Sequence, residues 1–152
     1  MIIVPDSTAE IVAQISNLRR LRSLALAVIG LGASGDIRAS VQAGSAIVQA
    51  IPRTSLKALH ITFSTEILAA AAMKDGSDGQ DRLAFKEFET AVLTVPSQAV
   101  TFSLGNARKN NRVLWTSCLG RAFPQLKNRG MLRLVDQSLA CKCCRYCLCR
   151  II

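Results

Sequence analysis

Hydrophobic residues recur along the chain in two alternating patterns, one with the period of a helix and one with the period of a strand. Apolar residues three or four apart predict helices over residues 7–18, 36–52, 85–95 and 115–126. Short apolar segments between these stripes predict strands over residues 23–29, 56–63, 98–104 and 131–135. The polar, glycine-rich segment 74–82 predicts a surface loop.

The order helix, strand, helix, strand predicts a parallel sheet, because parallel strands are joined by crossover connections that usually contain a helix. Residues 21–26 have the spacing L-x-x-L-x-L, and residues 56–61 repeat it 35 residues later. Weaker copies occupy residues 99–104 and 129–134. This repeat predicts an α/β fold in the form of a short leucine-rich-repeat-like solenoid, with parallel strands on one face and helices on the other.

The two sides of each strand have different surroundings in such a solenoid. Leu24 and Leu26 are predicted to face the helices, so the residues that alternate with them face the open side. Solenoids expose that concave side to their partners. We therefore predict a non-catalytic protein-protein interaction module. The predicted contact residues are Ala25, Ala27, His60, Thr62 and Ser103.

Length and composition are consistent with one globular domain. The chain has 152 residues, of which 50% are hydrophobic and 19% charged, and this composition excludes a wholly disordered protein. We predict a repeat-like α/β domain over residues 1–137 and a disordered, basic, cysteine-rich tail over residues 138–152. The sequence offers no apolar stretch of roughly 18 residues and no secretory leader. A cytoplasmic or nuclear protein without a transmembrane segment is the expectation.

The positive charge is concentrated in the last third of the chain. Residues 1–97 hold nine Lys and Arg against nine Asp and Glu, whereas residues 98–152 hold ten basic residues against Asp136 alone. A basic run from Arg108 to Arg133 is able to adsorb to phosphate backbones or acidic lipids. One Trp and one Tyr in the whole chain do not supply the stacking surface of single-strand binders. We therefore predict only non-specific electrostatic contact with nucleic acid.

The segment from Trp115 to Leu134 contains Phe-Pro-Gln-Leu at 123–126, followed by Arg-Gly-Met-Leu-Arg-Leu at 129–134. It resembles the closing segment of fungal F-box-type proteins with degenerate leucine-rich repeats. The resemblance covers residues 7–135 and implies the substrate-reading end of a ubiquitin-ligase adaptor-like protein. No F-box is predicted ahead of the repeats. Many such repeats carry an asparagine after the strand, whereas this chain has Ile29 and Ser64 at the corresponding positions.

The alternative function is dinucleotide binding. Gly30, Gly32 and Gly35 form a G-x-G-x-x-G motif between a predicted strand and a predicted helix, which is the context of a Rossmann-like loop. The free N–H groups of that helix would bind pyrophosphate. Asp36 places a carboxylate in the same turn, and Glu66 lies 36 residues beyond Gly30 instead of about 20. We therefore keep a Rossmann-like fragment as the alternative and predict no cofactor.

Catalytic groups are scarce in the sequence. His60 is the only histidine, and we predict that it projects from the open side of the second strand. No motif in the sequence indicates a nucleophile and an orienting acid close to His60, which a catalytic histidine would need. Glu87 and Glu89 are interpreted as part of a solvated helix face. We predict no enzyme activity.

Five of the six cysteines lie in the predicted tail, and the sixth is Cys118. Their C-x-C and C-x-x-C spacings would hold thiolates close enough for a soft metal ion such as Zn²⁺ or Cu⁺. Two other interpretations are an inert reduced tail and thioacylation, which would tether the basic tail to a membrane surface. The candidate metal ligands are Cys141, Cys143, Cys144, Cys147 and Cys149.

Overall fold

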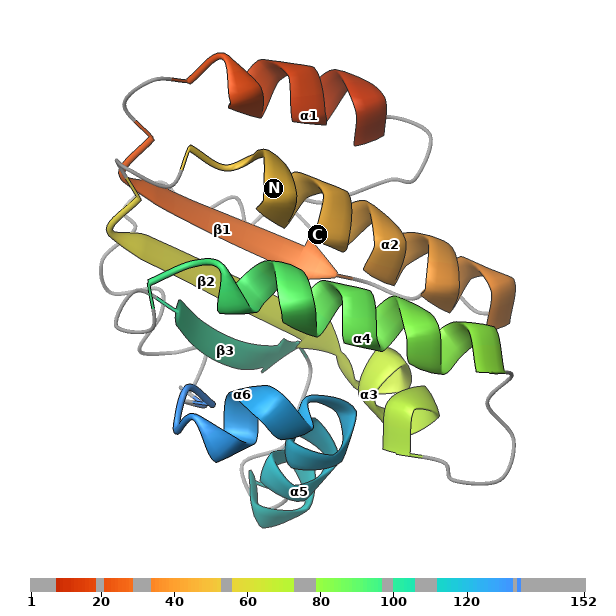
Figure 1. Cartoon of the computed structure of the whole chain (residues 1–152). Helices are drawn as coiled ribbons and strands as arrows, with labels where there is room; N and C mark the ends of the chain where they lie inside the picture. The colour runs from red at the N-terminus through yellow and green to blue at the C-terminus, as the bar shows by residue number, and fades with distance from the viewer. Residues whose placement is uncertain are drawn as a thin grey trace.

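Three parallel strands form an open sheet in the order in which they occur along the chain, β1-β2-β3 (Figure 1). The computed structural model describes residues 8–18, 21–28, 34–52, 56–72, 79–96, 100–105, 112–132 and 134. Its strands are β1 (Ser23–Val28), β2 (Ala58–Ser64) and β3 (Val100–Gly105). Its helices are α1 (Thr8–Ser16), α2 (Ser34–Ala50), α3 (Thr65–Ala72), α4 (Gly79–Leu93), α5 (Arg112–Ala122) and α6 (Pro124–Asn128). The predicted α/β class and the parallel sheet are therefore confirmed.

The register of the sheet aligns the first two copies of the leucine repeat. Leu24 lies beside Leu59, and Leu26 lies beside Ile61. The third copy is offset by two residues, because Phe102, its second position, lies beside Ile61, the third position of the second copy. Equivalent positions of the repeat therefore lie side by side in β1 and β2 but not in β2 and β3.

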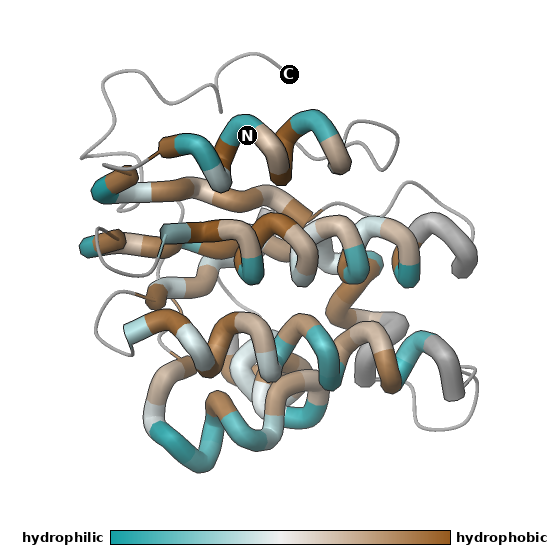
Figure 2. The backbone as a smooth tube through the Cα atoms, turned by 45° about the horizontal axis from the view of Figure 1, so that its top comes forward, coloured by the Kyte–Doolittle hydropathy of each residue, from teal (hydrophilic) through white to brown (hydrophobic). Residues whose placement is uncertain are grey.

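The sheet has one apolar face, and α2 and α4 cover it (Figure 1). Side chains alternate between the two faces of each strand, as the period of two requires. Seven strand residues on the covered face are at most 1% exposed: Leu26, Val28, Leu59, Ile61, Phe63, Val100 and Phe102. Ala25, which was predicted on the opposite side, is exposed. Figure 2 shows the strands mostly in brown and white, whereas teal recurs along the outer turns of the helices.

Helix α2 packs closely against α4 because it has a glycine at the contact. A Cβ atom added to Gly44 would lie 3.0 Å from Cε2 of Phe88 and 3.3 Å from Cγ2 of Val28. On its other side α2 contacts α1, whose Ile15 is buried in the same core. A small residue at position 44 therefore sets the distance between α2, α4 and the sheet.

We expect Gly44→Val to lower the free energy of unfolding by about 1–2 kcal/mol, because its branched side chain would overpack this contact. Gly44→Ala is the matched control, since one methyl group requires a shift of only a few tenths of an ångström and alanine favours helix. Urea denaturation measures both variants. Equal stability of Gly44→Val and wild type would show that α2 and α4 have room to separate.

The predicted last helix is divided in two. Helix α5 ends at Ala122, and α6 begins at Pro124, because proline has no N–H to donate and fits the first helical position. Gly130, with φ of 65°, then ends α6. The N–H of Gly130 donates to the carbonyl of Lys127 at 3.0 Å, and the N–H of Met131 donates to Leu126 at 2.9 Å, which is the Schellman arrangement.

The structure corrects three further expectations. The strand predicted over residues 131–135 is represented among the described residues only by a single parallel bridge between Leu134 and Phe102. Its first residue is instead used to close α6. Helix α3 was not predicted, although its alanine-rich sequence favours a helix. Helix α4 begins at Gly79, inside the predicted loop 74–82.

Candidate functional site

Four polar side chains on the face of the sheet opposite α2 and α4 are joined by hydrogen bonds. Nδ1 of His60 lies 2.8 Å from Oγ1 of Thr101, and Nε2 lies 2.9 Å from Oγ of Ser103. Oγ1 of Thr62 lies 2.8 Å from the same Ser103 oxygen. The register brings them together, because His60 pairs with Thr101 and Thr62 pairs with Ser103 across β2 and β3.

Because side chains alternate between the two faces of a strand, these four polar side chains all point to the same face. Their hydrogen bonds to one another give each buried polar group a partner. Burial lowers the pKa of His60, so the ring is neutral at pH 7. A neutral imidazole donates from one nitrogen and accepts at the other. One neighbouring hydroxyl therefore accepts from the ring while the other donates to it, and the third hydroxyl completes the chain through Ser103.

The pair of His60 and Ser103 has the separation of a general base and a nucleophile, but its surroundings differ from a catalytic site. Ser103 is 0% exposed, which leaves its oxygen no contact with a substrate. The group that orients the other ring nitrogen is the hydroxyl of Thr101 and not a carboxylate. The arrangement is suited to holding β2 and β3 in register and fixing the histidine ring.

The structure separates the predicted contact residues into accessible and inaccessible ones. Ala25 is exposed, whereas Ala27, His60 and Thr62 are half-buried. Ser103 is fully buried, and its hydroxyl joins His60 to Thr62, so its role as a contact residue stays a prediction that its burial does not favour. Thr101 was missed by the sequence analysis. Its position two residues before Ser103 is the signal that places it on the same face as His60.

We expect the protein to lose stability through His60 as the pH falls below 6.5, the ordinary pKa of histidine. The unfolded chain binds a proton at that pKa, while the folded chain binds it only at a lower pH. Between the two values the unfolded state holds more protons, so the free energy of unfolding falls on acidification. Urea titrations at about pH 7.5 and about pH 5.5 measure the difference.

His60→Gln is the control for that measurement, because it removes the titrating group and retains hydrogen-bonding capacity. Its loss of stability between the two pH values is expected to be smaller than that of wild type. An equal loss in both proteins would show that carboxylates account for the whole effect.

The other candidate sites are only partly within the described residues. Gly30 and Gly32 lie outside them, while Gly35 lies in the first turn of α2, which follows β1 as the motif requires. The order β1-β2-β3 runs in one direction, so the described sheet has no point of reversal where a dinucleotide crevice forms. The five tail cysteines and the predicted tail, residues 138–152, also lie outside. Cys118 is buried and unpaired.

Within the ranges that the structure describes, no three His, Cys, Asp or Glu side chains are grouped to hold a metal ion. None of the helices in those ranges has the length and apolar character needed to cross a membrane.

No known protein family, curated protein or solved structure with which the chain was compared matches it. The resemblance to F-box-type leucine-rich-repeat proteins therefore stays a prediction. The sheet face opposite α2 and α4, with its hydrogen-bond network, is a feature of the described residues that bears on function.

Proposed function

We propose that the protein is a non-catalytic protein-protein interaction module that binds its partner on the open face of the sheet. The observation that carries this proposal is that, among the described residues, α2 and α4 cover one face of the sheet (Figure 1). The strand residues that point to the other face are small or polar, among them Ala25, His60 and Thr62. The network around His60 holds that face in one conformation, so a partner would meet a preorganised surface.

We also propose the finer description of the fold as a short leucine-rich-repeat-like solenoid. The sequential strand order and the two in-register copies of the leucine repeat support it. The adaptor role implied by the segment from Trp115 to Leu134 is part of the same proposal. The upstream reading frame of the gene tests this role, because an F-box encoded there would support it and an unrelated domain would contradict it.

Site-specific photocrosslinking tests the binding face. A photoreactive phenylalanine analogue replaces Ala25, which is exposed on the open face beside His60 in the strand register. The matched control places the same group at Leu83, which is 49% exposed on α4. We expect one defined adduct from position 25 and none from position 83. Adducts from position 83 alone, or equal adducts from both, would contradict the assignment.

The dinucleotide alternative is tested by thermal unfolding with NAD and NADP. A ligand present at a hundred times its Kd stabilises the folded state by about 2.7 kcal/mol, which a melting curve detects. We expect no rise in Tm with either cofactor, because the described sheet has no point of reversal. A rise that Gly32→Val abolishes would support the Rossmann-like interpretation and overturn ours.

A further inference from the structure

Helix α5 exposes two aliphatic side chains. Val113 is 86% exposed and Leu114 is 55% exposed, and both lie in its first turn. The helix is anchored by Cys118 and Leu119, which are buried. Cys118 lies one turn beyond Leu114, so Leu114 is at the edge of the buried stripe, while Val113 points away from it. These two residues are therefore available to a partner while the helix itself is held by the core.

Cationic side chains share this outward side. Arg121 follows Leu114 by seven residues, which is nearly two helical turns, so the two lie on one side about 10 Å apart along the axis. Arg121 is exposed. Leu114 and Arg121 thus place an apolar and a positive group on the same face of α5.

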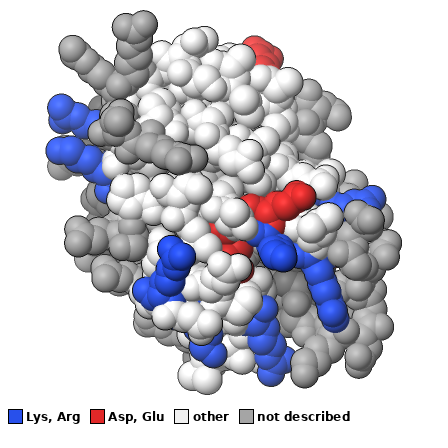
Figure 3. Space-filling model, in the orientation of Figure 1, with Lys and Arg blue, Asp and Glu red and all other residues white. Residues whose placement is uncertain are grey.

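Lys127 of α6 adds a second positive group to the same face. A Cβ atom at Gly120 would lie 2.9 Å from Cδ and 3.6 Å from Nζ of Lys127, so the lysine side chain crosses α5 beside Arg121. Arg129, just beyond α6, is also exposed. Figure 3 shows Lys and Arg atoms in the lower part of the molecule, where α5 and α6 lie, and further ones at the upper left and right edges, with red atoms at the centre and the top.

Helices α5 and α6 carry no acidic residue of their own, and the Glu89 carboxylate that reaches α6 from α4 is buried at the Leu126 N–H. Residues 98–135 contain no Asp or Glu. The occupant of this surface must therefore be anionic, and it must also have an apolar layer that accepts Val113 and Leu114. A polyanion such as nucleic acid meets the first requirement only, and Trp115 is half-buried against the core, so it offers no stacking surface for bases.

We propose that this α5–α6 surface, formed by Val113, Leu114, Arg121, Lys127 and Arg129, docks on an anionic lipid membrane. The leaflet supplies negative headgroups to the three cations and an acyl boundary a few ångströms below them to the two aliphatic side chains. The contact is peripheral. It is separate from the open sheet face and does not depend on the function proposed for that face.

Vesicle co-sedimentation of the full chain under reducing conditions tests the proposal. Vesicles of phosphatidylcholine with phosphatidylserine are compared with vesicles of phosphatidylcholine alone, and we expect partitioning only into the first. Each cation near an anionic leaflet contributes about fivefold to partitioning, so Arg121→Gln with Lys127→Gln is expected to lower it roughly 25-fold. Val113→Ser with Leu114→Ser is expected to lower it about tenfold.

The matched control is Arg22→Gln with Lys57→Gln, which removes the same charge from two exposed residues that directly precede β1 and β2. We expect it to change partitioning less than about threefold, and melting curves verify that every variant is folded. An equal loss in the control would show adsorption through net charge alone and overturn the proposal. Absence of wild-type partitioning would also overturn it. So would unchanged partitioning of the Val113→Ser, Leu114→Ser variant if the protein bound heparin, a polyanion without an apolar layer, as well as it bound the vesicles.

Discussion

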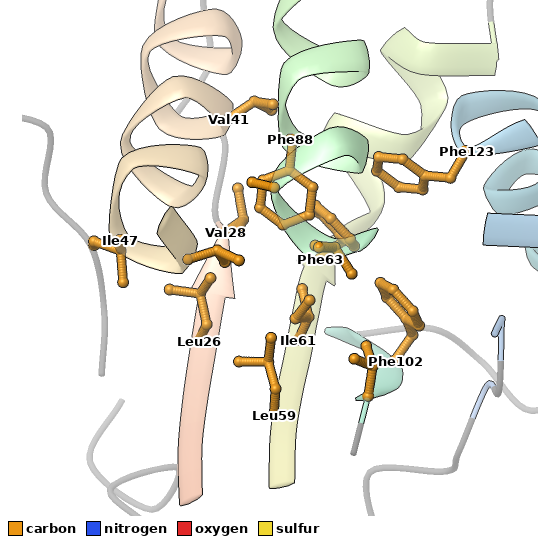
Figure 4. Close-up of a cluster of buried hydrophobic side chains, with 14 of the residues drawn as sticks. Leu26, Val28, Val41, Ile47, Leu59, Ile61, Phe63, Phe88, Phe102 and Phe123 are labelled. Atoms are coloured by element: carbon orange, nitrogen blue, oxygen red, sulfur yellow. The ribbon is translucent and has the colours of Figure 1, made fainter. Parts of the chain in front are cut away.

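Replacing Phe123 with alanine is expected to lower the free energy of unfolding by about 3–5 kcal/mol. Phe123 is 0% exposed and joins the two C-terminal helices to the core (Figure 4). Its ring contacts the other four phenylalanines of the chain, with centroids 5.4 Å from Phe63, 5.8 Å from Phe88, 5.9 Å from Phe85 and 6.4 Å from Phe102.

The size of the effect follows from where these rings come from. Phe63 and Phe102 belong to β2 and β3, and Phe85 and Phe88 belong to α4, so Phe123 holds α5 and α6 against both layers. An alanine would remove the ring from the centre of this cluster and leave a cavity that rigid strands cannot close. Such a loss is a large part of the 5–15 kcal/mol that stabilises a typical domain.

Urea denaturation measures this loss, and two controls define it. Phe123→Leu retains much of the volume and is expected to cost less than half as much as the alanine variant. Val113→Ala, at an exposed position of α5, is expected to change stability by less than about 0.5 kcal/mol. A loss below about 1.5 kcal/mol for Phe123→Ala would mean that α5 and α6 contribute little to the folding unit.

The alternation of apolar and small residues was sufficient to predict the sheet and its covered face. Leu26 is buried and Ala25 is exposed because one face of each strand must pack under a helix, and this requirement is local in sequence. The period of two also places Thr101 and Ser103 with His60. It does not reveal that Ser103 is buried, because burial depends on what covers the face.

Contacts between distant segments were beyond sequence reasoning. Residues 115–126 were predicted as one helix, whereas Phe123 occupies the break between α5 and α6 and packs on four rings from other elements. Glu89 was interpreted as solvated because it alternates with apolar residues on α4, yet it is 2% exposed. Its partner lies 37 residues away in sequence. No local pattern contains information about that pairing.

Glu89→Ala is expected to lower the free energy of unfolding by about 2–3 kcal/mol, because the Glu89 carboxylate caps α6 from a different helix. Its Oε1 accepts a buried hydrogen bond of 2.9 Å from the N–H of Leu126. Phe123, the N-cap residue of α6, provides no side-chain hydrogen bond, and Pro124 has no N–H. Glu89 therefore accepts a hydrogen bond from a free N–H at the start of α6, which in most helices is the role of a Ser or Asp side chain at the N-cap position.

The alanine variant would leave the Leu126 N–H buried without an acceptor and would remove a negative charge from the positive end of the helix dipole. Glu89→Gln retains an acceptor oxygen without the charge, so its expected loss is about 1 kcal/mol. Glu87→Ala removes an exposed carboxylate from the same helix and is expected to change stability by less than about 0.5 kcal/mol.

Amide hydrogen exchange distinguishes a local cap from a general loss of packing. In Glu89→Ala the amide of Leu126 is expected to exchange faster by more than the global loss of stability explains, while amides of β2 follow the global change. If Glu89→Gln were as unstable as Glu89→Ala, the charge and not the acceptor oxygen would be the stabilising feature. If Leu126 exchanged only as fast as the strands, the cap would not be a separate contribution, since α6 would then open only when the whole domain unfolds.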